Sequence, residues 1–129
     1  MTILLLIFGL IMFIGLVVVH EWGHFIAARR SGVVVEEFGL GFPPRAKIVS
    51  KKRGTIYSLN WLPLGGFVRL KGEHDSDTTP GSFGAATTAD KIKIMLAGVG
   101  MNLLVAYILF TVLALMGMPR LVEDQFVVT

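Results

Sequence analysis

Two long apolar runs dominate the hydropathy pattern of this chain. The first extends from Ile3 to Val19 and continues through a polar cluster to Ala28, and the second extends from Ile94 to Met118. Each run is longer than the roughly 18 residues that a helix needs to cross about 30 Å of hydrocarbon. A chain of 129 residues has too small a core to bury two such helices. We therefore predict two transmembrane helices, at residues 1–30 and 92–118.

The segment between the two runs has the shorter period that is typical of β structure. Stretches rich in β-branched and aromatic residues alternate with Gly and Pro, and Lys51–Gly54 has the pattern of a hairpin turn. Residues 33–71 are predicted to form a small antiparallel sheet of roughly four strands, followed by a loop at 72–91. The predicted fold class is thus a membrane α-helical protein with a small β-sheet between its two helices. The expected strands are Val33–Phe38, Ala46–Ser50, Thr55–Asn60 and Gly66–Leu70.

The segment Trp61–Phe67 is too apolar for an exposed cytoplasmic turn. Non-helical backbone enters a bilayer only where it lies against protein or a water-filled cavity. We expect this part of the sheet to be membrane-reentrant. A hydrophobic turn that merely packs against the helices is the alternative, and the two interpretations are compatible.

Composition excludes an ordinary soluble domain. Hydrophobic residues make up 53% of the chain, and its mean hydropathy is +0.71. Cysteine is absent from the sequence, which excludes disulfides and thiolate metal sites within this chain. The first apolar run lacks a basic region before it and a small-residue cleavage site after it, so we expect it to be retained and not removed as a signal peptide.

The basic residues predict the orientation of the chain in the membrane. Eleven of the 12 Lys and Arg residues fall between Arg29 and Lys93. The positive-inside rule then places the loop 31–91 in the cytoplasm and both termini outside. Because these residues are scattered through one loop of a membrane protein, they do not indicate nucleic-acid binding.

The polar cluster at the end of the first run carries the candidate chemistry. His20 and His24 are four residues apart, so they project from nearly the same face of a helix. Two neutral imidazoles at this spacing can hold one zinc ion, and Glu21 lies beside them as a candidate general base for hydrolysis. The alternative is a pair of ordinary helix histidines, but ionisable groups at the end of an apolar run are costly and indicate a function.

Fewer signals come from the rest of the chain. Asn102 is the only strongly polar residue of the second run. It is predicted either to form an interhelical hydrogen bond or to act at the active site. The small residues Ala97 and Gly98 permit close helix approach. His74 lies in a polar loop and is expected to be solvated. Thr88 or Asp90 is expected to cap the second helix.

Together these residues resemble the site-2 protease family of intramembrane zinc metalloproteases, in particular the bacterial regulators of sigma-factor signalling. The H-E-x-x-H motif at the end of the first helix is similar to that of the family. Three further segments are similar in sequence and order, and they extend the resemblance over essentially the whole chain. These are Phe38–Phe42, Leu62–Val68 and Ala97–Asn102.

The sequence departs from the family pattern in two places. Val99 stands where the family usually has proline. The third zinc ligand of the family is an aspartate in a later transmembrane helix, beyond one or more PDZ domains, and the spacing of the loop aspartates Asp75, Asp77 and Asp90 does not suit that role. The chain is therefore expected to be the N-terminal part of a longer protease, with residues 119–129 starting an extracytoplasmic segment.

The resemblance implies a zinc-dependent endopeptidase that hydrolyses transmembrane segments of membrane proteins. The N-terminal part that this chain represents is expected to be inactive by itself. His20 and His24 would bind Zn²⁺, and Glu21 would be catalytic. The implied partners are the lipid bilayer and a transmembrane substrate, such as a membrane-anchored anti-sigma factor or a signal-peptide remnant. The residues expected to bind substrate are Leu64, Gly65, Gly66, Phe67 and Asn102.

Two rival functions remain at this point. A catalytically incomplete membrane protein of the same fold could bind partners through its sheet, and the missing third ligand favours it. A metal transporter or sensor could use the two histidines as a transit site, but it would have no need of Glu21 or of the apolar strand at 62–66.

Overall fold

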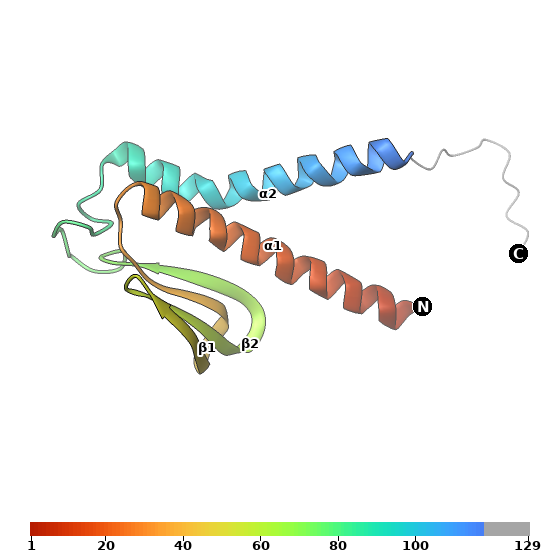
Figure 1. Ribbon diagram of the computed structural model, residues 1–129, viewed down its shortest axis with the longest axis horizontal. Coiled ribbons are helices and arrows are strands. Elements are labelled where there is room, and N and C mark those ends of the chain that lie inside the picture. Colours follow the sequence, from red (N-terminus) through yellow and green to blue (C-terminus); the bar gives the residue numbers. More distant parts are fainter. Residues whose placement is uncertain (118–129) are drawn as a thin grey trace, which may run out of the picture.

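Two long helices and one antiparallel pair of strands make up the computed structural model, which describes residues 1–117. The elements follow in the order α1 (Thr2–Arg30), β1 (Val35–Lys52), β2 (Thr55–Leu70) and α2 (Thr88–Met116). Helix α1 contacts the other three elements, whereas α2 contacts α1 alone among them. In Figure 1, the sheet and α2 flank α1, and the start of α1 and the end of α2 lie at the same end of the molecule.

Both helices are long and apolar enough to cross a membrane. Helix α1 ends as predicted, with Arg29 and Arg30 in its last turn and Gly32 in a left-handed conformation just after it. Helix α2 begins earlier than predicted, because the Thr87 hydroxyl accepts a hydrogen bond from the backbone N–H of Asp90. The cap is therefore Thr87 and not Thr88 or Asp90. The expected extracytoplasmic segment at 119–129 lies outside the described residues.

The prediction of roughly four strands is wrong, because the described chain forms two long strands. The Gly and Pro residues between the expected strands bend the backbone without ending the pairing. The first half of β1 has partners in two parts of β2: Phe38 pairs with both Tyr57 and Val68. Each long strand thus covers two of the segments that the sequence suggested as separate strands.

Glycines are needed where the strands turn and bend. The hairpin turn consists of Arg53 and Gly54, which both have positive φ, between the paired residues Lys52 and Thr55. In the bend of β1, Gly41 has a φ of 80°, and a Cβ there would lie 2.5 Å from the carbonyl oxygen of Leu62. Only glycine suits this position.

The small hydrophobic core lies where α1 ends and the sheet begins. Phe25 of α1 packs edge-to-face against Phe38 of β1, with ring centroids 5.8 Å apart. Ala28 is completely buried, and Ile94 joins the first turns of α2 to the same cluster. This core fixes the end of α1 against both the sheet and α2.

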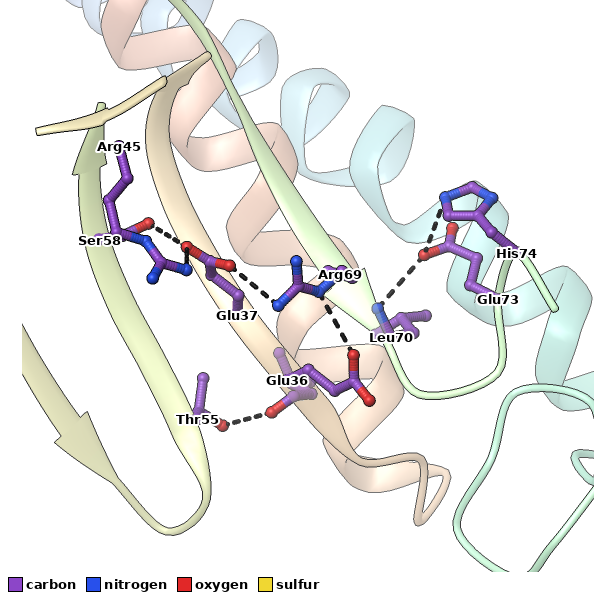
Figure 2. A network of polar contacts seen from close by, with 10 residues as sticks. Glu36, Glu37, Arg45, Thr55, Ser58, Arg69, Leu70, Glu73 and His74 are labelled. Carbon is purple, nitrogen blue, oxygen red and sulfur yellow. Dashed lines mark hydrogen bonds and ion pairs between the residues drawn. The ribbon is translucent and has the colours of Figure 1, made fainter. Parts of the chain in front are cut away.

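A buried carboxylate connects different parts of the sheet. The side chain of Glu37 is 2% exposed, and it accepts hydrogen bonds from the Ser58 hydroxyl at 2.6 Å and from Arg45 at 2.8 Å. Arg69 forms an ion pair with its other oxygen at 3.1 Å, as Figure 2 shows. Burial alone would raise the pKa of Glu37, but these hydrogen bonds and the two arginines outweigh it and lower the pKa below its ordinary value.

Candidate active site

Two residues of the H-E-x-x-H motif, His20 and His24, lie on the side of α1 that faces α2, whereas Glu21 lies beside β2. The predicted one-turn spacing brings the two imidazoles together: Nε2 of His20 lies 3.1 Å from Nε2 of His24. Their rings meet edge-on, with centroids 4.8 Å apart. Both histidines therefore present the same ring nitrogen to one point in space.

Two groups of α2 lie close to the Nδ1 atoms of the two imidazoles. The His24 Nδ1 atom lies 2.7 Å from the carbonyl oxygen of Ile94, and the side-chain nitrogen of Asn102 lies 3.4 Å from Nδ1 of His20. Since a carbonyl oxygen only accepts hydrogen bonds, a neutral His24 carries its proton on Nδ1, and its Nε2 is then an acceptor that faces Nε2 of His20. That tautomer is the one a metal ligand needs.

Gly98 makes room for the two rings. It lies between Ile94 and Asn102 at a spacing of four residues from each, so the three share one face of α2. A Cβ at this position would lie 2.6 Å from Nε2 of His24 and 2.7 Å from the ring of His20. The close helix approach predicted from Ala97 and Gly98 is confirmed here, and also at Gly23, where a Cβ would lie 2.5 Å from the Ala97 carbonyl oxygen.

The paired imidazoles fit a zinc ion, although they do not complete a site. Two nitrogens bound tetrahedrally at about 2.0–2.1 Å lie roughly 3.3 Å apart, close to the separation of the two Nε2 atoms. Within residues 1–117, no three His, Cys, Asp or Glu side chains gather closely enough to hold a metal. Catalytic zinc sites normally have three protein ligands, so a further ligand is required.

The apolar end of the sheet lies beside Glu21. A cavity of about 480 Å³ is bounded by apolar residues of α1, by Glu21 and His20, and by the bend of β2. A Cβ on Gly66 would lie 3.5 Å from Cγ of Glu21, at ordinary van der Waals distance, so the strand passes directly beside this side chain. The other residues that line this cavity are Phe13, Leu16, Val17, Phe42, Leu64, Gly65 and Asn102.

A second, smaller cavity of about 220 Å³ also has Glu21 in its lining. Phe67 and His24 line this cavity, together with Glu73 from the loop after β2. A cavity of about 420 Å³ elsewhere on the sheet is lined by Glu37 and its arginines and by none of the motif residues.

The structure thus brings most of the predicted site residues together. His20, Glu21, Leu64, Gly65, Gly66 and Asn102 share the larger cavity, and His24, Glu21, Gly66 and Phe67 share the smaller one. His74 is 83% exposed and lines the cavity of about 420 Å³ on the sheet, which none of the motif residues line. Sequence reasoning missed the Ile94 carbonyl and Glu73: a backbone acceptor has no sequence signal, and a loop acid shows its position only in the folded chain.

Comparison with known proteins decides the family. The model of peptidase family M50 matches residues 8–126, which is nearly the whole chain. The chain belongs to peptidase family M50. This family consists of membrane proteases of the site-2 type, which confirms the resemblance seen in the sequence.

Individual M50 relatives agree with this assignment. A protein described as a candidate zinc metalloprotease of Clostridium perfringens is 44% identical over 111 residues, covering 85% of this chain and 32% of its own length. A Campylobacter jejuni protein of the same description is 40% identical over 113 residues, covering 82% of this chain and 30% of its own. The chain thus spans about a third of the length of these curated relatives.

Proposed function

We propose that this M50 chain is the N-terminal part of a zinc-dependent intramembrane endopeptidase that cleaves transmembrane segments of membrane proteins. One observation carries the proposal: two imidazoles with converging Nε2 atoms lie on an apolar helix beside a carboxylate, and a cavity runs from that carboxylate along a bent strand. The names of the relatives support zinc as the metal.

Each motif residue has a defined task in this proposal. His20 and His24 hold the zinc, which when bound supplies the Lewis acidity that activates water and polarises the scissile carbonyl. Glu21 accepts a proton from the attacking water and delivers it to the leaving amine. Asn102 lines the larger cavity and can donate its amide N–H to a backbone carbonyl of the substrate.

The bent strand β2 is the proposed substrate platform. A transmembrane helix hides its peptide bonds and must unwind before hydrolysis, so the site has to hold an extended segment. Within residues 1–117, the register pairs Gly66 and Phe67 with β1 only, which leaves the opposite edge of this strand for an added strand. The partners proposed are therefore a transmembrane protein, such as an anti-sigma factor or a signal-peptide remnant, and the surrounding lipid.

Proline at the platform tests strand addition. Phe67→Pro removes a backbone N–H from the proposed platform, and Val49→Pro is the matched control on the opposite outer part of the sheet, in an exposed residue. We expect F67P to lower cleavage of a transmembrane substrate at least about tenfold and V49P to have a much smaller effect. Equal cleavage by F67P and the unmodified protein would refute strand addition.

One alternative function has an observation in its favour. Because residues 1–117 offer two metal ligands and no third, a catalytically incomplete membrane protein could use the same sheet for binding only. The decisive experiment compares Glu21→Gln with the unmodified full-length protein, reconstituted in liposomes with a transmembrane substrate. The protease account predicts that E21Q abolishes cleavage and still binds zinc. A folded, zinc-loaded full-length protein that cleaves no transmembrane substrate would favour the alternative.

A further inference from the structure

The polar side chain of Asn102 is in an unusual position on α2. Asn102 is the residue of this helix whose side chain reaches His20, and its Oδ1 atom is buried without a hydrogen-bond partner in the described part of the chain. A buried amide oxygen without a partner is costly and requires an explanation. The neighbouring imidazole provides one.

Metal binding would require one particular tautomer of His20. If Nε2 of His20 binds metal as an acceptor, the proton of the ring lies on Nδ1, which then becomes a donor. The Asn102 side chain places its NH₂ group 3.4 Å from that Nδ1 atom, so two donors would face each other. The oxygen and nitrogen of an amide are interchanged by a half-turn about the last side-chain torsion.

A half-turn of this amide gives Oδ1 a donor and removes the contact between the two donors. It brings Oδ1 to Nδ1–H of His20, and it moves the NH₂ group to the buried position that Oδ1 held. The arrangement then matches that of His24, whose Nδ1 already meets the carbonyl oxygen of Ile94 at 2.7 Å. Ile94 and Asn102 are eight residues apart on one face of α2, with Gly98 between them.

We propose that α2 is a positioning element for both histidines: the Asn102 side-chain oxygen fixes His20, and the Ile94 carbonyl fixes His24, so that both Nε2 atoms face one metal. This inference rests on the proposed zinc site. It gives Asn102 a role in metal binding in addition to the proposed contact with substrate. Groups that accept the second N–H of a ligating histidine typically change metal affinity about 10- to 100-fold when they are removed.

Zinc affinity of the full-length protein in detergent micelles tests this role, with a chelating dye as competitor. Asn102→Leu and the smaller Asn102→Ala remove the acceptor, whereas Asn102→Asp keeps an acceptor at the same place. We expect N102L and N102A to bind zinc about 10- to 100-fold more weakly and N102D to stay within about threefold of the unmodified protein. Thr111→Val is the matched control, because its hydroxyl bonds the Tyr107 carbonyl on an exposed part of α2.

The outcomes separate this inference from the proposed function. If the unmodified protein binds no zinc, the proposed function fails. If it binds zinc and a folded N102L or N102A binds equally tightly, the positioning role is overturned. A weakened N102D equal to N102L would also overturn it, since then the acceptor is not what matters. Thermal unfolding of each variant identifies those that are folded. If N102L is not folded, N102A replaces it in the comparison.

Discussion

Gly98 shows how a single residue can control the candidate active site. The Cβ of even the smallest side chain would lie 2.6 Å from Nε2 of His24 and would meet the ring of His20 as well. We therefore expect Gly98→Ala to push the rings apart and to lower zinc affinity at least about tenfold. Zinc titration against a chelating dye measures the effect in the full-length protein.

Gly100 provides the control for this substitution. It lies two residues further along α2, and a Cβ there would meet no atom within 4 Å. Because both changes replace a helix glycine with alanine, Gly100→Ala has the same intrinsic effect on the helix, which alanine favours. Equal zinc affinity in G98A and G100A would contradict the described packing of α2 against the two imidazoles.

Glu37 predicts a pH-dependent stability of the sheet. Its pKa is lower in the folded chain, so its contribution is present above its unfolded-state pKa of about 4.3 and is lost as the pH falls through the folded-state pKa. Glu37→Gln is expected to cost about 1–3 kcal/mol at pH 7 and to flatten this acid dependence. Thermal unfolding between pH 7 and 3 measures both effects.

Glu36 is the matched control for the acid dependence. Its side chain is 45% exposed and forms an ion pair with Arg69 at 3.3 Å. Exposed pairs typically contribute about 0–1 kcal/mol, so Glu36→Gln should leave the acid dependence nearly as steep as in the unmodified protein. The same loss of slope in both variants would show that the buried carboxylate is not its source.

The motif residues could be predicted from the sequence because helix geometry alone brings residues four apart to one face. This spacing was sufficient to predict that His20, Glu21 and His24 lie together. The contact between Asn102 and His20 joins residues that are 82 positions apart, and it depends on how α2 rotates about its axis. No local pattern determines that rotation, so the sequence left Asn102 with two alternative roles.

At the scale of whole elements, the start of α2 depends on a side-chain cap. The Thr87 hydroxyl accepts the Asp90 N–H at 3.2 Å. Thr87→Ala is expected to lower the free energy of unfolding by about 1 kcal/mol, since a free helix N–H is left behind. Thr88→Ala, in the adjacent first residue of the helix, is the control and should have a smaller effect. Thermal unfolding of both variants in detergent checks this order, and its reversal would place the cap at Thr88.

The sheet shows where prediction of elements reached its limit. Gly and Pro correctly marked the positions at which the strands change direction, and the turn at Arg53 and Gly54 was expected from the sequence. Local patterns cannot distinguish a bend from an end, because that depends on whether backbone pairing continues beyond the break. Here pairing continues past Gly41, as shown by the pair of Phe42 with Leu62, and two long strands result.

At the scale of the whole molecule, the orientation in the membrane is a prediction from charge. The chain contains no cysteine, so Lys52→Cys in the hairpin and Thr2→Cys at the start of α1 can each introduce one labelling site, once any cysteines elsewhere in the full-length protein are replaced. The positive-inside rule predicts that an impermeant maleimide added to intact cells labels position 2 and not position 52. The opposite pattern would invert the proposed topology.

The most direct test of the central claim is the zinc content of the full-length protein, purified without added metal. The account predicts about one zinc per molecule in the unmodified protein and in Glu21→Gln, and strongly reduced zinc in His20→Ala and His24→Ala. Such a result would identify the two converging imidazoles as metal ligands. It would also leave proton transfer, and not metal binding, as the role of Glu21. A folded, unmodified protein without zinc would contradict the account. So would histidine variants that hold as much zinc as the unmodified protein.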